Sequence, residues 1–260
     1  MSRSSLLVQV GMLARRSVVR TLRQPAMVVP SLVFPLLLLA INSSGLESVT
    51  RLPGFPTDSY FQFALAIPFV QGALFSANSA GTNVANDIES GFLNRLSLTP
   101  LRRVALLMGQ LAGILALGLI QALTFVAVGI AFGEGIQAGV PGALVIVALS
   151  LVISLAFGCI GAFVALRSGS GEAVQGVFPL FFAALFLSSM AIPRDLIEVH
   201  WFQTVADWNP VSYMLEGIRS LVIEGWNGEA LALGFACAGG LALIALAGAS
   251  SALRTRMVRA

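Results

Sequence analysis

Long apolar runs fill most of this chain, and short polar stretches separate them. A helix needs about 20 mostly apolar residues to cross a hydrocarbon layer of about 30 Å. Spanning helices are predicted near residues 26–42, 60–85, 104–132, 142–166, 174–192 and 230–252. Of the 260 residues, 10% are charged, whereas soluble domains carry about 25%. The sequence therefore predicts an all-α membrane protein with six transmembrane helices in one domain, residues 26–260.

The first apolar run, residues 26–42, has a second interpretation. It contains Pro30 and Pro35 and follows several arginines, as the apolar core of a cleaved signal peptide would. A long leader precedes it, and no small-x-small cleavage site comes directly after it. These two features favour a first span, and a signal peptide is kept as the alternative.

The arginines are distributed unevenly among the polar stretches. All 15 basic residues are Arg, and the side holding residues 43–59, 133–141 and 193–229 has only Arg51, Arg194 and Arg219. An excess of positive charge in short loops marks the cytoplasmic side of a membrane. We therefore expect both termini in the cytoplasm. Arg-only usage with abundant Ala and Gly is typical of high-GC bacteria, so a multi-pass protein of the bacterial inner membrane is expected.

Residues 1–25 form a separate basic segment ahead of the first span. Apolar residues recur within it at three- and four-residue spacing, while Arg15, Arg16, Arg20 and Arg23 fall largely on another face. This pattern predicts a cytoplasmic amphipathic helix. Such a helix either holds the first span in register against anionic lipid or lies along the membrane surface as an interface helix. The two interpretations are compatible.

The residue types that are scarce exclude several kinds of chemistry. Without Lys, the chain has no P-loop lysine or Schiff base. His200 alone makes no metal site, and Cys159 and Cys237 lie in apolar runs, where packing is expected and a disulfide is the alternative. No catalytic residue, metal or cofactor is therefore expected on this chain. The arginines do not cluster on one soluble face, so no nucleic-acid partner is expected.

The six apolar runs contain no Asp, Glu, His or Arg, although ion-coupled transporters usually place such residues there. Amide side chains are the main polar groups, and Gln71, Asn78 and Asn83 are candidates for lining a pathway. Hydrogen bonding between helices is the alternative role for each. An uncharged interior indicates that energy for transport comes from another polypeptide, such as an ATPase that meets the cytoplasmic loops.

Two polar segments carry further patterns. A short helix between Asp87 and Leu98 would present Phe92 as part of a knob for a cytoplasmic partner, with an ordinary solvated loop as the alternative. On the outer side, amphipathic helices are predicted at 196–205 and from Pro210 to Gly225, with Asn209 as the N-cap of the second. Nearby Trp and Tyr suggest re-entrant or interfacial helices, and a passive lid is the alternative.

In order along the chain, three motifs resemble the membrane subunit of ABC type-2 exporters of the daunorubicin-resistance and nodulation-protein branch. The first is the basic leader. The second is Asp87-x-Glu89-x-Gly91, continued by Pro100 and Arg102. The third is the run Asn209-Pro210-x-x-Tyr213-x-x-Glu216-x-x-Arg219 before the last span. The motifs are loose individually and become specific when combined with six spans and this orientation.

The resemblance implies a permease that exports drugs, lipids or glycolipids and pairs with a second, identical or similar permease subunit. Two P-loop ATPase subunits would bind ATP and Mg. The first polar loop would be a coupling helix, and the leader, with Arg15, Arg16 and Arg20, an interface helix beside it. By position, the residues that transmit movement would be Asp87, Glu89, Gly91, Arg95 and Pro100. A stand-alone secondary transporter or channel, and a non-transporting assembly protein, are the alternatives.

Overall fold

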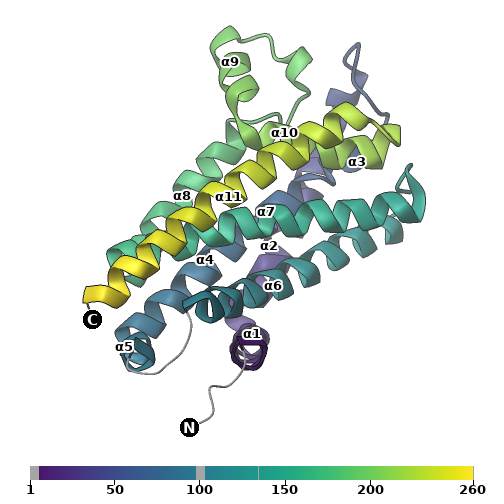
Figure 1. Cartoon of the computed structure of the whole chain (residues 1–260). Helices are drawn as coiled ribbons and strands as arrows, with labels where there is room; N and C mark the ends of the chain where they lie inside the picture. The colour runs from purple at the N-terminus through teal and green to yellow at the C-terminus, as the bar shows by residue number, and fades with distance from the viewer. Residues whose placement is uncertain (1–5, 98–102, 134, 260) are drawn as a thin grey trace.

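The computed structural model describes residues 6–97, 103–133 and 135–259, and every regular element in those ranges is helical. The long helices run side by side between two ends (Figure 1). One end carries α1 (Leu6–Leu22), α5 (Phe92–Ser97) and the end of α11 (Gly228–Arg259), and the other carries α3, α9 and α10. The prediction of an all-α membrane protein is confirmed.

Five helical stretches are long and apolar enough to span a membrane, and a sixth is shorter. The spans, in chain order, are α2 (Pro25–Gly45), α3 (Tyr60–Ala64) continued by α4 (Ile67–Glu89), α6 (Arg103–Ala131), α7 (Gly139–Ser168), α8 (Gly171–Phe186) and α11. These bounds agree with a fold of about six spans. Cys159 and Cys237 are both free thiols.

The fifth span ends earlier than predicted. Residues 174–192 were expected to be helical, but α8 stops at Phe186, and the Ser188 hydroxyl donates to the Leu185 carbonyl in the turn that follows. Its 16 residues rise about 24 Å, which is less than a hydrocarbon layer of about 30 Å. Hydropathy did not reveal the end because residues 187–191 contain no charged residue.

Helix α4 is the central helix of the bundle and packs most closely against α7. At the crossing, a Cβ atom on Gly161 would overlap the carbonyl group of Ala77, and one on Gly81 would lie 2.9 Å from the carbonyl oxygen of Gly161. Small residues allow this approach because no side chain separates the two backbones. The largest fully buried side chains of the described residues include Tyr60, Phe63, Phe125, Leu149 and Met214.

Replacing Gly161 with Ala is expected to destabilise the bundle, because the new methyl group would meet the Ala77 carbonyl. Overpacking of this kind costs about 1–3 kcal/mol. The measurement is thermal unfolding of the purified protein in detergent. Gly240→Ala is the control, because Gly240 is helical and no atom lies within 4 Å of the place that its new methyl group would take. Equal melting temperatures for the two variants would contradict the close crossing.

The remaining helices, at the end of the bundle that carries α9 and α10, are short. They are η1 (Glu47–Arg51), η2 (Arg194–Leu196), α9 (His200–Trp208), α10 (Pro210–Arg219) and the π-helical turn η3 (Ser220–Glu224). Trp201 and Trp208 of α9 are exposed, whereas Met214 and Leu215 of α10 are fully buried. Helix α10 is therefore packed within the bundle, whereas α9 lies at its surface, and a re-entrant or interfacial role for these helices stays a prediction.

Three predicted helix boundaries can be compared with the structure. The second helix ends at Gly225 as predicted, with φ +96°. The first was predicted at 196–205 but runs from His200 to Trp208. The short helix predicted from Asp87 to Leu98 also differs, since α4 continues through Glu89 and α5 begins only after a turn at Gly91, φ +68°.

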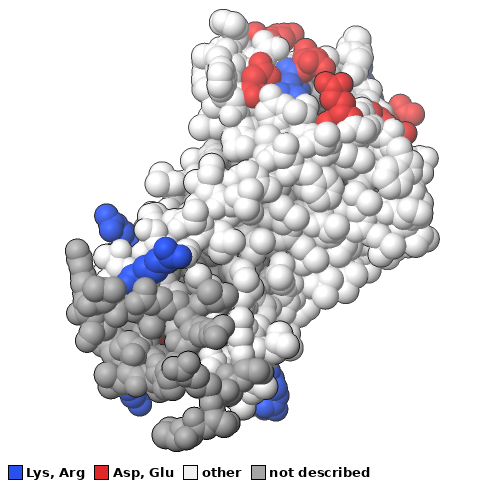
Figure 2. Space-filling model, in the orientation of Figure 1, with Lys and Arg blue, Asp and Glu red and all other residues white. Residues whose placement is uncertain are grey.

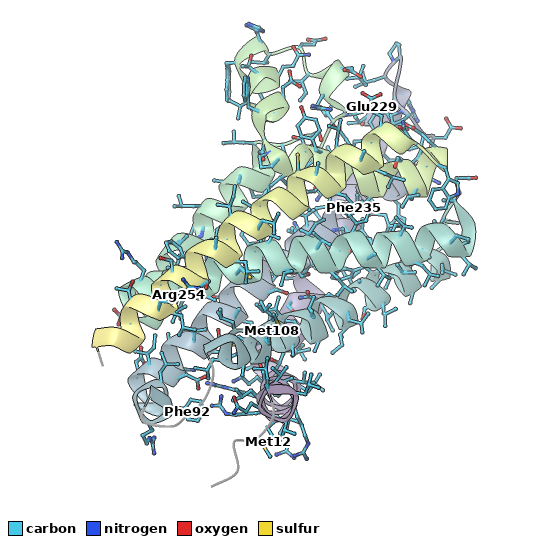
Figure 3. All side chains as sticks on the ribbon, viewed as in Figure 1. Met12, Phe92, Met108, Glu229, Phe235 and Arg254 are labelled. Carbon is cyan, nitrogen blue, oxygen red and sulfur yellow. The ribbon has the colours of Figure 1, made fainter. Side chains whose placement is uncertain are left out.

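Charge is separated between the two ends (Figure 2). We call the end with α1 and α5 the basic end, and the end with α3, α9 and α10 the acidic end. In Figure 3, Met12 and Phe92 mark the basic end and Glu229 the acidic end. Between them, the visible surface is a broad band without charged atoms (Figure 2), as expected for surface that faces lipid.

Candidate functional site

Helix α1 at the basic end is held against α6 by small residues. A Cβ atom on Gly109 would lie 2.6 Å from Leu13, and one on Gly113 would lie in contact with Ser17. Thr21, one turn further along the same face of α1, is buried as well. The amphipathic helix predicted in residues 1–25 is thus present over Leu6–Leu22, and its face toward the bundle is made largely of small and polar residues.

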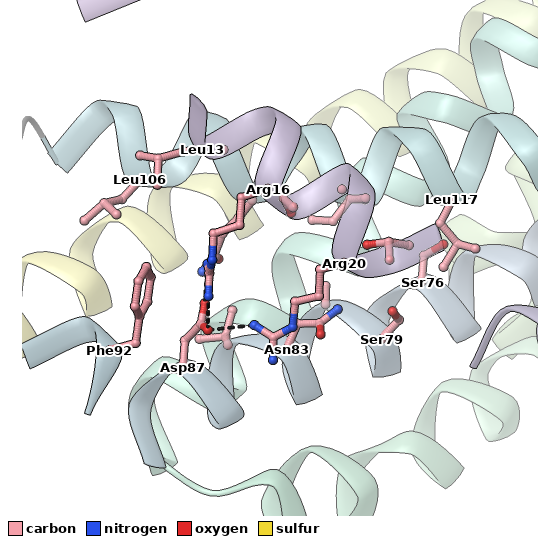
Figure 4. Close-up of a pocket in the computed structure, with 18 of the residues that line it drawn as sticks. Leu13, Arg16, Arg20, Ser76, Ser79, Asn83, Asp87, Phe92, Leu106 and Leu117 are labelled. Atoms are coloured by element: carbon pink, nitrogen blue, oxygen red, sulfur yellow. Dashed lines mark hydrogen bonds and ion pairs between the residues drawn. The ribbon is translucent and has the colours of Figure 1, made fainter. Parts of the chain in front are cut away.

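Asp87 links α1 to α4. The Arg20 guanidinium donates to one carboxylate oxygen at 2.6 Å, and Arg16 donates to both oxygens, at 2.9 and 3.3 Å (Figure 4). The Asp87 side chain is 11% exposed, while those of Arg20 and Arg16 are 24% and 41% exposed. Low exposure strengthens these charge-assisted bonds. We call this group the Asp87 latch.

The Asp87 latch also contacts α5. The Arg16 guanidinium lies 3.9 Å from the centre of the Phe92 ring, so Arg16 touches the last turn of α4 and the first residue of α5 together. Figure 4 shows Phe92 beside Arg16 and Asp87. Leu93, the second residue of α5, is buried. The sequence placed Asp87 and Phe92 in one short helix, and the structure brings them together from two helices joined by a turn.

The other predicted coupling residues occupy different places. Arg95 is exposed and donates to the carbonyls of Ser90 and Gly91, so it braces the turn before α5. Glu89 accepts from the Gly171 amide, 3.4 Å away, at the start of α8. Pro100 lies outside the described residues.

A small cavity of about 50 Å³ lies between α1, α4 and α6, next to the Asp87 latch. Its polar lining includes Ser17, Ser76, Ser79, Asn83 and Gln110. A cavity of this size holds one or a few water molecules. Within the described ranges, no group of three or more His, Cys, Asp or Glu side chains could hold a metal ion.

At the acidic end, members of the predicted Asn-Pro-Tyr-Glu-Arg motif bond to other segments of the chain. The Asn209 side chain accepts from the Val211 amide as an N-cap, with Pro210 in the first turn, as predicted. Its Nδ2 also donates to Ala184 and Leu187 at the end of α8, at 2.6 and 3.0 Å. Asn209 thereby fastens α10 to α8.

Glu216 and Tyr213 of this motif share a partner that the sequence did not suggest. Arg194 donates to both carboxylate oxygens of Glu216, at 2.7 and 2.6 Å, and its guanidinium lies 4.3 Å from the centre of the Tyr213 ring. Burial lowers the pKa of Arg194, but Glu216 and Tyr213 together more than offset this, so its pKa is raised. Arg194 is one of three arginines on an otherwise acidic side. That isolated positive charge was the sequence feature that could have pointed to an ion pair here.

Arg219 is a buried cation that bonds to no carboxylate among the residues that the structure describes. It is 6% exposed and donates to three backbone carbonyls, those of Phe63 at 3.1 Å and of Ser189 and Met190 at 2.6 Å each. Burial lowers its pKa to about 10, opposed by the charges of Glu216 and Tyr60, so it stays protonated at neutral pH. Hydropathy gave no sign of this charge in the interior. We call these contacts the Arg219 clamp.

The three candidate pathway residues all lie on α4. Gln71 is 1% exposed, and its side-chain oxygen has no hydrogen-bond partner among the described residues; the same holds for Asn78 Oδ1. Asn83 accepts from Gln24 at 3.2 Å and lines the small cavity. The bond to Gln24 is a helix-to-helix contact, and a pathway role for all three stays a prediction.

Known proteins resemble this chain over most of its length. A family model described as ABC-2 type transporter matches residues 8–223. A probable doxorubicin resistance ABC transporter permease protein DrrC from Mycobacterium tuberculosis (strain ATCC 25618 / H37Rv) is 23% identical over 81% of this chain and 75% of its own. Putative transport permeases ycf38 from Pyropia yezoensis and Porphyra purpurea are 26% and 25% identical, over 86% and 85% of this chain and 77% of theirs.

Proposed function

Because this chain belongs to the ABC-2 type transporter family, and is therefore the membrane subunit of an ABC transporter, we propose that it exports cargo from the cytoplasm. Separate P-loop ATPase subunits, two per transporter, bind ATP and Mg and supply the energy. The basic end faces the cytoplasm of a bacterial inner membrane, which the excess of arginine at that end supports. Two permease subunits, identical or similar, form the pathway between them.

The Asp87 latch is the observation that carries this proposal. Force applied to α5 by an ATPase reaches Arg16 through Phe92 and reaches α1 and α4 through Asp87. Helix α4 has 23 residues, so it is about 35 Å long and can carry a displacement to the Arg219 clamp at its far end. The two networks lie at opposite ends of one span, as a gating mechanism needs.

The proposed cargo is hydrophobic or amphipathic. The described part of each spanning helix carries charged residues only at its ends, for example Asp87, Arg167 and Glu229. Recognition would therefore come from aromatic and amide side chains, such as Phe75 and Asn78 on α4. A relative named for doxorubicin resistance supports an amphipathic drug as one candidate, beside lipids and glycolipids.

Purification of the tagged chain in mild detergent from its own membranes is expected to yield a P-loop ATPase in near-stoichiometric amount. Reconstituted into vesicles, the complex should hydrolyse ATP and move an amphipathic dye in an ATP-dependent manner. A single-chain oligomer with no ATPase would contradict the proposal and favour a stand-alone channel.

The same preparation tests the role of α5. Glu89→Gln combined with Arg95→Gln is expected to lower export about tenfold or more, while ATP hydrolysis and membrane insertion persist, because both residues brace the turn that would receive force. Arg51→Gln, which removes an exposed charge at the acidic end, is the control. Unchanged transport by the double variant would refute a transmitting role for this turn.

A further inference from the structure

One face of α1 forms an open basic groove, which we call the arginine groove. Its volume is about 530 Å³, and Arg15, Arg16, Arg20 and Arg23 line it together with Met12 and Val19. No Asp or Glu is among the described residues that line it. Met12 is 69% exposed and Val19 is 37% exposed, so the groove combines four guanidinium groups with apolar surface.

The positive charge in the groove exceeds the negative charge available to it. Asp87, which does not line the groove, pairs with Arg16 and Arg20. Arg15 and Arg23 have no carboxylate within 4.0 Å anywhere in the ranges that the structure describes. One carboxylate thus serves two of the four guanidinium groups, and those of Arg15 and Arg23 are available to an anion from outside the chain.

The position of α1 indicates where that anion comes from. Helix α1 ends at Leu22, and the membrane-spanning α2 begins three residues later at Pro25. Successive side chains of an α-helix are rotated by about 100° around its axis, so Leu7 and Leu22 lie on one side of α1, next to the side that carries Arg15. Leu7 is 82% exposed and Leu22 is 51% exposed. An exposed apolar flank beside a basic one is the pattern of a helix lying at the membrane surface.

We propose that the arginine groove binds the phosphate group of an anionic lipid from the leaflet at the basic end of the bundle. Guanidinium groups bind phosphate with paired, charge-assisted hydrogen bonds, and Met12 and Val19 would contact the glycerol and upper acyl chain. Arg16 and Arg20 line both this groove and the cavity of the Asp87 latch. A bound phosphate would therefore share these two guanidinium groups with Asp87.

The test uses the purified full-length chain and measures lipid binding by native mass spectrometry, without ATPase or cargo, so its result does not depend on the proposed export. The probes are phosphatidylglycerol and phosphatidylcholine with the same acyl chains, plus inorganic phosphate. Arg15→Gln with Arg23→Gln removes two guanidinium groups and keeps the Asp87 latch. Arg167→Gln with Arg254→Gln removes two exposed arginines at the same end and is the matched control. Circular dichroism checks the helix content of each.

The wild-type chain is expected to bind phosphatidylglycerol about tenfold or more tightly than phosphatidylcholine. The Arg15/Arg23 variant should bind phosphatidylglycerol roughly 30-fold more weakly than the wild type, from the usual contribution of two arginines near a charged surface. The control variant should bind phosphatidylglycerol less than about threefold more weakly than the wild type.

Three results would overturn the proposal. Equal loss in both double variants would mean general electrostatic attraction and no site. Displacement of phosphatidylglycerol by millimolar inorganic phosphate would identify a site for free phosphate. Unchanged lipid binding by the Arg15/Arg23 variant, with loss of a co-purifying ATPase, would make the groove a protein-docking surface.

Discussion

Asp87→Asn is expected to release α1 from the bundle while leaving the spanning helices folded. The neutral amide keeps the size of the side chain but removes the charge that attracts Arg16 and Arg20. A hydrogen bond to a charged partner contributes about 1.5–3 kcal/mol. The contribution from Arg16 is discounted, because its side chain is 41% exposed and water screens the pair. We expect α1 to be less firmly attached by about 1–3 kcal/mol.

Trypsin provides the measurement, since it cleaves after Arg15, Arg16, Arg20 and Arg23 on α1 and directly after it. If α1 detaches and reattaches fast relative to cleavage, weakening its attachment by about 1–3 kcal/mol raises the cleavage rate about 5- to 150-fold. ATP-driven export should fall together with the attachment of α1, because movement of α5 would no longer reach both helices.

The control for this experiment is Glu172→Gln, which removes a carboxylate at the start of α8, at the same end of the bundle. It should leave trypsin cleavage and export at wild-type levels. If Asp87→Asn and Glu172→Gln are cleaved at the same rate, the Asp87 latch does not hold α1, and the coupling pathway proposed above fails with it.

The largest loss of stability is expected from Arg219→Met. This change leaves three buried carbonyls, of Phe63, Ser189 and Met190, without their donors, and each such loss costs about 1–3 kcal/mol. Removing the desolvation cost of the buried charge offsets part of this. We expect a net loss of about 2–4 kcal/mol, which lowers the melting temperature by roughly 5–15 °C for a chain of this size.

Thermal unfolding in detergent measures the effect, with Arg51→Met as the control, because Arg51 is an exposed arginine at the same end. The melting temperature of Arg219→Lys should fall between those of Arg219→Met and Arg51→Met. An ammonium group keeps the charge but lacks the planar guanidinium that reaches three carbonyls. A melting temperature for Arg219→Met within about 2 °C of the control would contradict the Arg219 clamp.

These two clusters differ in how far the sequence could anticipate them. The motif that runs from Asn209 to Arg219 placed its members on one short helix correctly, because an N-cap followed by proline is a local signal. Its partners come from distant segments, namely Arg194, Phe63 and the turn after α8. No local pattern encodes such contacts, since they depend on where α8 ends and where α3 breaks from α4.

The structure corrects the predicted shape of the coupling segment, while its coupling role stays a prediction. Asp87 and Phe92 were singled out, but they were placed in one helix, and the turn at Gly91 separates them. The positively charged leader was predicted to be helical from its periodicity. That two of its arginines bind Asp87, about 70 positions away, follows from the docking of α1 on Gly109 and Gly113.

Sequence alone determined the membrane class, the approximate spans and the separation of arginine from acid. Each of these depends on hydrophobic length and on charge, which are local sums over neighbouring residues. Tertiary structure decided which helices are buried, where the fifth span stops and which charges meet. Those outcomes depend on helix packing, in which a single small residue such as Gly161 sets the distance between two backbones. A buried charge such as Arg219 is then stable only because packing brings three carbonyls to it.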